Sequence, residues 1–322
     1  MKIVKPCYYK DFKCIAGECP DSCCQGWEVD ADSESLAFYN TLDSSLEIKK
    51  RIDSVLDKDE FGNTIFTLAP KKRCPFLNSE NLCDMHIAIG GEHTPYTCRT
   101  FPRFIYDFGS VREIGISFSC PVATDLIYAL NSHLTFDVEV NTEPPALNDI
   151  DGELYYKLSN SRKDIYNILQ SDESIALRLI KMLEYAEKLQ SEIDSYEKGN
   201  DETDFFGVFI NPELINPEWE EKVKNRENRS IENSFFNENI AVYFIYKYFM
   251  QAVFDLDVLS KAKMAAVGVL ISTYFGNDAW TMHLWSKETE HSQYNMDRYK
   301  QLLKNAKCLS TQALIERIKQ CQ

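Results

Sequence analysis

The 322-residue sequence is poor in basic residues and has no long apolar run. Lysine and arginine number 35 against 50 aspartates and glutamates, which gives a formal net charge of −15. This deficit of positive charge argues against binding to nucleic acid or to an anionic membrane, and it favours a basic partner. The longest apolar run, MAAVGVLISTYF at 264–275, is too short to cross a bilayer and predicts a buried helix.

The sequence also lacks a recognisable secretory signal and any glycine-rich phosphate loop. MKIVKPCYYKDFKC, at the N-terminus, has a lysine but no apolar stretch after it. We therefore expect a cytoplasmic protein that binds neither membrane nor nucleic acid. No glycine-rich turn joins a predicted strand to a helix, so a Rossmann-type fold is not expected.

Cysteine is nearly absent from the last two thirds of the chain. Nine of the eleven cysteines lie at or before Cys120, and only Cys308 and Cys321 follow it. Cytosolic thiols are kept reduced, so a cysteine cluster in such a protein indicates metal binding or catalysis rather than a disulfide framework.

A change in pattern near residue 135 predicts two domains. Before it lie all the clustered cysteines, a helical pattern at 33–58 capped by Asp32 or Ser33, a strand at 64–68 and a hairpin at 103–118. A helix is predicted from Pro121, and 141–151 is the best linker. We therefore predict a cysteine-rich domain with short strands over 1–135.

The rest of the chain, 136–322, predicts an α-helical domain. Helices are expected over 152–170, 172–197, 236–255, 257–275, 278–304 and 310–320, with a long polar loop at 198–233. The segment 241–254 is apolar on nearly every face and predicts a central helix. The expected fold class is thus α+β and mostly α.

Eight cysteines are candidate metal ligands. Thiolates prefer zinc or iron–sulfur centres. The set begins with C-x4-C-x3-CC and continues at wider spacing: Cys14, Cys19, Cys23, Cys24, Cys74, Cys83, Cys98 and Cys120. Eight donors suffice for two four-thiolate centres, or for one such centre with four cysteines left over. The spacing is compatible with both.

The adjacent pair Cys23 and Cys24 poses a geometric problem. In extended chain, consecutive side chains point to opposite sides. We therefore expect that the two thiols do not both bind one metal atom, so that either they serve different centres or only one is a ligand.

The spacing leaves zinc and iron–sulfur open but argues against radical chemistry. Structural zinc sites usually use paired short knuckles, and here no second short pair follows. Widely spread ligands suit a cluster held by loops at least as well. A radical-type C-x3-C-x2-C motif would need a cysteine where Gly26 stands.

Three further residues near the cysteines are candidate site residues. His86, three residues after Cys83, is either a nitrogen ligand or a structural histidine. Arg99 and Arg103 follow Cys98, and they are predicted to bind the cofactor by offsetting the negative charge of a thiolate centre or by clamping a carboxylate. Pairing with surface acids is the structural alternative.

The ordered motifs C-x4-C-x3-CC, CPFL, LCDMH and CRTFPR resemble those of the flagellin lysine-N-methylase family. That family lies within a wider group of zinc- or iron-chelating proteins with a CxxxCxxCC-like signature. The segment WSKETEHSQYNMDRY at 285–299 is similar to the tail motif of the family. The resemblance implies S-adenosylmethionine-dependent methylation of lysine ε-amines in flagellin, or in a similar surface-organelle protein, with a bound [4Fe–4S] cluster and zinc as the alternative.

Glu288, His291 and Asn295 of the tail motif are the candidate catalytic residues. Their spacing of i, i+3, i+7 predicts one shared helix face, which could line a substrate pocket or bind a metal through E-x2-H. A polar stripe that ties the helix to its neighbours is the structural alternative.

Two other functions compete with the methyltransferase. A non-enzymatic zinc or Fe–S binding module, acting as a metal chaperone, sensor or scaffold, needs the same cysteines and predicts no turnover. A redox protein would need a cluster that can be reversibly reduced.

Overall fold

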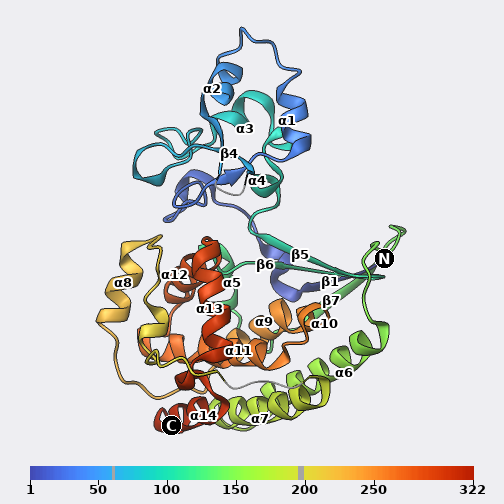
Figure 1. Ribbon diagram of the computed structural model, residues 1–322, viewed down its shortest axis with the longest axis vertical. Helices are drawn as coiled ribbons and strands as arrows, with labels where there is room; N and C mark the ends of the chain where they lie inside the picture. The colour runs from blue at the N-terminus through green and yellow to red at the C-terminus, as the bar shows by residue number, and fades with distance from the viewer. Residues whose placement is uncertain (60–61, 195–198) are drawn as a thin grey trace. The chain divides into compact units, whose positions relative to one another are not determined.

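The computed structural model describes residues 1–59, 62–194 and 199–322, and its chain forms two compact units (Figure 1). Unit 1 consists of Met1–Phe12, Ile105–Ser119 and Ala123–Gln322, and unit 2 of Lys13–Phe104 with Cys120–Val122. The sequence predicts a boundary near residue 135. The structure differs because the first strand pairs with strands on both sides of that position, and so joins the helical unit.

A four-stranded sheet explains this difference. Its strands are β1 (Lys2–Pro6), β5 (Arg103–Phe108), β6 (Val111–Ile116) and β7 (Phe136–Val140), in the order β5-β6-β1-β7. Strand β1 runs parallel to β6, with Lys2 opposite Val111, and antiparallel to β7, with Lys2 opposite Val140. Strands β5 and β6 form the hairpin that the sequence predicts.

Helices make up most of unit 1. The longer ones are α5 (Pro121–Tyr128), α6 (Gly152–Leu169), α7 (Ile175–Ile193), α8 (Pro217–Lys224), α9 (Phe235–Tyr248), α11 (Val258–Phe275), α12 (Ala279–Glu290), α13 (Gln293–Asn305) and α14 (Thr311–Gln320). Short turns of helix are η1 (Cys7–Asp11), η5 (Gly207–Phe209), η6 (Phe249–Gln251), α10 (Ala252–Asp255) and η7 (Lys307–Leu309). The chain is therefore α+β and mostly helical, as predicted.

Three boundaries in unit 1 differ from the prediction. A 3-10 turn, η6, divides the helix expected at 236–255. Ser292 interrupts the helix expected at 278–304, because its hydroxyl caps α13 by accepting from Asn295 N. The expected loop at 198–233 contains α8, which begins at Pro217 after the cap Asn216. Residues 195–198, at the end of the helix expected at 172–197, lie outside the described residues.

The core of unit 1 is built around α9 and α11, which pack side by side (Figure 1). A Cβ on Gly268 of α11 would lie 2.9 Å from ring carbons of Phe244 in α9, so glycine permits this close approach. In the described part of the chain, α11 is the one helix long and apolar enough to cross a membrane, and 94% of it is buried inside the protein. This confirms the predicted buried helix.

Unit 2 contains short elements. Its strands are β2 (Val29–Asp30), β3 (Leu56–Lys58) and β4 (Thr64–Phe66), in the antiparallel order β2-β4-β3. Its helices are α1 (Ser33–Tyr39), α2 (Glu47–Val55), α3 (Asp84–Ile89) and α4 (Tyr96–Thr100), with 3-10 turns η2 (Ala16–Glu18), η3 (Pro70–Lys72) and η4 (Gly91–His93). The predicted helix at 33–58 is thus two helices, and Asp32 caps the first by accepting from Ser35 N at 3.0 Å.

Candidate functional site

Six thiols of unit 2 are close enough to influence one another electrostatically. They come from three separate segments of the chain: Cys14, Cys23, Cys24, Cys74, Cys83 and Cys98. We call these six the thiol cluster. Cys24 is the neighbour that four of the other five share, because it raises the pKa values of Cys23, Cys74, Cys83 and Cys98.

Backbone contacts bring the first two segments together. Cys74 N donates to the carbonyl of Cys24 at 2.8 Å, and Gly26 N donates to the carbonyl of Lys72 at 2.9 Å. At Gly17, an added Cβ would lie 2.7 Å from the backbone oxygen of Glu80. The cysteine-rich loop at 14–24 therefore lies directly against the loop that joins Cys74 to Cys83.

Polar side chains fix the loop between Cys74 and Cys83. The Asn78 carboxamide accepts from Glu80 N at 2.9 Å and Leu82 N at 3.0 Å, and it donates to Asp84 at 2.9 Å. Arg51 of α2 donates to Asp84 at 2.6 Å and to the carbonyl of Pro75. The positions of two cysteines thus depend on an arginine and an asparagine that the sequence analysis did not single out.

Four thiols of this cluster have raised pKa values. Burial raises the pKa of Cys74 to about 12 and raises the pKa values of Cys83 and Cys98, and the neighbouring thiols add to the effect. A hydrogen bond with Cys24, followed by burial, raises the pKa of Cys23. Two sulfurs nevertheless accept backbone N–H groups at 3.4 Å, Cys14 from Ala16 and Cys83 from His86, and such donors favour a thiolate.

The thiol cluster offers the donor chemistry of a soft or borderline metal. Among residues 1–59, 62–194 and 199–322, no three Cys, His, Asp or Glu side chains are already arranged to hold a metal ion. The donor type and the N–H···S contacts fit such a centre.

Cys23 and Cys24 lie in a turn, not in the extended chain that the prediction assumed. Their side chains are close enough for a hydrogen bond with Cys24 to raise the pKa of Cys23. That the two thiols do not both bind one metal atom stays a prediction.

The other predicted residues of unit 2 make contacts of their own. Cys19 donates to the carbonyl of Asp21 at 3.3 Å, and Cys120 is buried immediately before α5. Arg99 donates to the carbonyl of Glu92 at 2.7 Å and pairs with the exposed Glu34 at 3.3 Å, which matches the surface-pairing alternative. Arg103 begins β5.

His86 lies within α3, and its backbone N donates to Cys83 Sγ. This contact ties the histidine backbone to the cluster and leaves the role of its ring as a prediction.

The tail residues Glu288, His291 and Asn295 do not share one helix face. Helix α12 ends at Glu290, and His291 caps it before α13 begins. Glu288 is fully buried and accepts from the backbone N of Ile215 at 2.9 Å. Burial raises its pKa, although the N–H groups of 215 and 216 oppose this.

Asn295 completes the same contact with the segment at 211–216. Its side-chain amide donates to the carbonyls of Glu213 and Glu288, each at 2.7 Å. Glu288 and Asn295 therefore hold the segment at 211–216 in place. This matches the structural alternative, in which polar side chains tie the helix to its neighbours. A catalytic role for Glu288, His291 and Asn295 stays a prediction.

A buried ion pair that the sequence analysis did not predict lies next to these residues in unit 1. Glu290 accepts from Lys247 Nζ at 2.6 Å, Ser117 Oγ at 2.6 Å and the Tyr248 hydroxyl at 2.7 Å. The two charged side chains are 11% and 5% exposed. Burial alone would raise the pKa of Glu290, but the Lys247 charge outweighs it and holds the pKa below its ordinary value.

Burial lowers the pKa of Lys247, and the Glu290 charge opposes this shift. An ionised carboxylate fixed by three donors is already oriented, which is a property of catalytic groups and of structural networks alike. The available sequence signal was a lysine within the otherwise apolar segment 241–254.

Comparisons with known proteins give three relatives. Two proteins named Lysine-N-methylase, from Salmonella choleraesuis and Salmonella typhimurium, are each 24% identical over 197 residues, which cover 58% of this chain and 48% of each relative. The Flagellar biosynthetic protein FliU of Salmonella muenchen is 24% identical over 128 residues, which cover 39% of this chain and 76% of that protein.

These relatives confirm the resemblance to lysine-N-methylases that the motifs predict. The chain spans about half the length of the two curated lysine-N-methylases that it matches. No protein-family model matches the chain, and no solved structure does.

Proposed function

We propose that the chain methylates lysine side chains of flagellin, or of a similar surface-organelle protein, with S-adenosylmethionine as the methyl donor. The observation that carries this proposal is the similarity to two proteins named Lysine-N-methylase. A third relative is named as a flagellar biosynthetic protein, which supports a flagellar substrate. The net charge of −15 suits a substrate that presents lysines.

The reaction sets two requirements for the protein. The lysine must be a neutral amine aligned with the methyl group of the sulfonium, and a carboxylate or tyrosine must orient the amine and take up its proton. In unit 1, Glu290 and the Tyr248 hydroxyl are a carboxylate and a phenol within 2.7 Å of each other. Glu288, His291 and Asn295 would position the adjoining segment, so that their replacement changes activity through geometry.

The thiol cluster would hold a metal centre, which we propose to be a [4Fe–4S] cluster, with zinc as the alternative. Cys19 and Cys120 are the further predicted donors. When bound, such a centre supplies a link between the segments that carry Cys24, Cys74 and Cys98, and its binding free energy contributes to folding. Arg99 and Arg103 would then offset its negative charge.

A second function is favoured by one observation. The thiol cluster lies within a unit that is compact by its own contacts. A non-enzymatic zinc or Fe–S binding module would use this unit alone, and it predicts metal-dependent binding of a partner without turnover.

The test is methyl transfer from labelled S-adenosylmethionine to purified flagellin, using protein isolated without oxygen and assayed for iron, zinc and sulfide. We expect label on flagellin lysines, located by mass spectrometry. At a temperature where circular dichroism shows both variants folded, Glu290→Gln should reduce the transfer at least tenfold, whereas Glu139→Gln, which removes an exposed carboxylate of β7, should leave it unchanged. A metal-loaded protein that binds flagellin but transfers no label would favour the binding module.

A further inference from the structure

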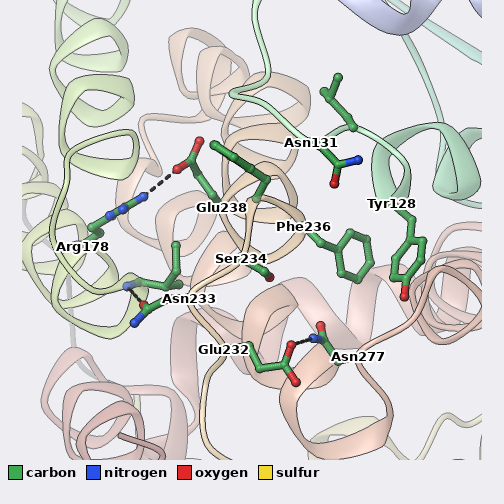
Figure 2. Close-up of a pocket in the computed structure, with 12 residues that line it drawn as sticks. Tyr128, Asn131, Arg178, Glu232, Asn233, Ser234, Phe236, Glu238 and Asn277 are labelled. Atoms are coloured by element: carbon green, nitrogen blue, oxygen red, sulfur yellow. Dashed lines mark hydrogen bonds and ion pairs between the residues drawn. The ribbon is translucent and has the colours of Figure 1, made fainter.

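Unit 1 contains a cavity of about 530 Å³ that none of the predicted site residues lines (Figure 2). It lies where helices α7 and α9 begin, next to the last residue of α5 and the segment that follows α11. Ligand sites for small molecules typically have roughly 300–1,000 Å³. The cavity therefore has room for a nucleoside-sized ligand.

The charged side chains of the cavity leave a net negative charge. Arg178 donates to Glu238 at 2.6 Å and to the backbone carbonyls of Glu173 and Leu169 at 2.6 and 2.9 Å. That pair is neutral as a whole, and the His133 ring contacts the other oxygen of the Glu238 carboxylate from outside the lining. Glu232 is the third charged residue of the lining, and its partner is the uncharged Asn277 amide at 2.6 Å (Figure 2). The lining therefore favours a cation.

Aromatic rings lie on the side of the cavity away from Arg178 (Figure 2). Tyr128 is 51% exposed, and its ring meets that of Phe236 edge to face, with centroids 4.9 Å apart. Phe235 is 41% exposed and lies instead against His133, with the two rings edge to face and their centroids 5.3 Å apart. Exposed aromatic rings accept a stacked heterocycle or a cation, and the Asn131 carboxamide supplies a hydrogen-bond donor and acceptor beside them.

We propose that this cavity is the binding site of the methyl donor S-adenosylmethionine, an inference that rests on the proposed function. The donor combines the two features that the lining selects: a heteroaromatic base for the exposed ring of Tyr128, and a sulfonium cation for the field of Glu232. A substrate lysine matches the charge alone and would leave the aromatic and carboxamide lining without a ligand group.

The test compares the binding of S-adenosylmethionine and of S-adenosylhomocysteine, whose sulfur is uncharged, by titration calorimetry on the full chain. Glu232→Gln should weaken S-adenosylmethionine binding about fivefold and S-adenosylhomocysteine binding less than about twofold. Tyr128→Ala should weaken both about tenfold, because both carry the base. Glu227→Gln removes a carboxylate of the same segment that pairs with Arg229 outside the cavity, and it is the matched control.

The outcomes separate this site from the proposed function. Wild-type binding that neither variant changes, with both variants folded by circular dichroism, overturns the site and leaves the proposed function standing. Absence of binding to the metal-loaded wild-type chain overturns both. If Glu232→Gln and Tyr128→Ala lose binding to a lysine-bearing flagellin fragment but still bind S-adenosylmethionine as the wild type does, the cavity holds the substrate lysine. That result overturns the proposal.

Discussion

The two units of the molecule are stabilised in different ways. In unit 1, α9 and α11 are buried on nearly all sides, so that long helices pack around an apolar centre. Unit 2 has strands of two or three residues and a small apolar cluster: Val29, Ala31, Tyr39, Ile52, Phe66, Phe76 and Met85. With so small a core, a bound metal would contribute a large share of the stability of unit 2.

Because of this difference, loss of the metal should affect unit 2 far more than unit 1. Cys24 is the common neighbour in the thiol cluster, so Cys24→Ser should abolish metal binding and unfold unit 2, since structural metal sites contribute about 10 kcal/mol or more to folding. Unit 1 should keep its helices. Limited proteolysis would show new cleavage confined to residues 13–104, with little loss of helical circular dichroism.

Cys308→Ser is the matched control, because Cys308 lies in η7 of unit 1. It should leave metal content and cleavage unchanged. If one centre forms and only one thiol of the adjacent pair binds it, Cys23→Ser and Cys24→Ser should lose unequal amounts of metal. Retention of the wild-type cleavage pattern after complete metal loss would show that the apolar cluster of unit 2 suffices.

The largest single effect expected in unit 1 concerns the buried ion pair. Glu290→Gln leaves the Lys247 ammonium buried without its countercharge, which should destabilise unit 1 by about 3–5 kcal/mol. In a Trp27→Phe background the remaining tryptophans, Trp219, Trp280 and Trp285, all lie in unit 1, so their fluorescence in urea reports its unfolding. Metal content should stay at the wild-type value.

The double variant Glu290→Gln, Lys247→Met sharpens this result. Removing both charges should restore much of the stability, because no buried charge is then left unpaired. A double variant as unstable as Glu290→Gln alone would show that the carboxylate acts mainly through Ser117 and Tyr248.

The fold was predictable where the signal is local. Helical periodicity located most helices of unit 1, and strand patterns located β4 and the β5–β6 hairpin. The errors came from competing local signals and from distant pairing. The Ser292 cap ended one helix inside a continuous periodic pattern, and the partners of β1 lie more than 100 residues away in the chain, where composition gives no indication of them.

The candidate site was predictable where residue chemistry alone suggests it. Cysteine spacing selected all six members of the thiol cluster, because few other functions need so many thiols in a reduced compartment. The buried ion pair could not be found in this way. Lys247 lies 43 residues from Glu290 and 130 residues from Ser117, so their contact exists only in the folded chain.

The stability of unit 1 should depend on pH through one buried lysine, Lys263. Lys263 donates to the carbonyl of Leu303 at 3.0 Å, and burial lowers its pKa to about 8, although Asp257 and Glu187 oppose this. The unfolded value is about 10.4, so between pH 8 and 10 the unfolded chain binds more protons and stability rises with pH. Lys263→Met should remove about 2 kcal/mol of this rise.

The quantity compared between the variants is the slope of the unfolding free energy against pH, because other groups titrate in the same pH range. Stability is measured by urea unfolding from pH 7 to 10.5 for the wild type, Lys263→Met and the control Lys300→Met, which changes an exposed lysine. The control should follow the wild type. Equal slopes for the wild type and Lys263→Met would show that Lys263 is not held neutral by burial.

The smallest expected effect tests a polar contact of unit 2. Asp32 accepts from Ser35 N at 3.0 Å and from Tyr96 N at 2.6 Å, and so joins α1 to α4. Burial would raise its pKa, but these N–H groups, the Ser35 hydroxyl and the Arg99 charge bring the pKa to about 2. Asp32→Ala should therefore destabilise this contact by about 1–2 kcal/mol at pH 7.

Hydrogen exchange of the peptides covering α1 and α4, in metal-loaded protein, measures this loss directly, and Asp53→Ala on the surface of α2 is the matched control. Because the folded pKa lies below the unfolded value, the contribution of Asp32 is complete above about pH 4 and is lost only as the pH falls toward 2. The difference between the wild type and Asp32→Ala should thus be the same at pH 7 and pH 5. A difference already absent at pH 7 would mean that these N–H contacts of Asp32 do not join α1 to α4.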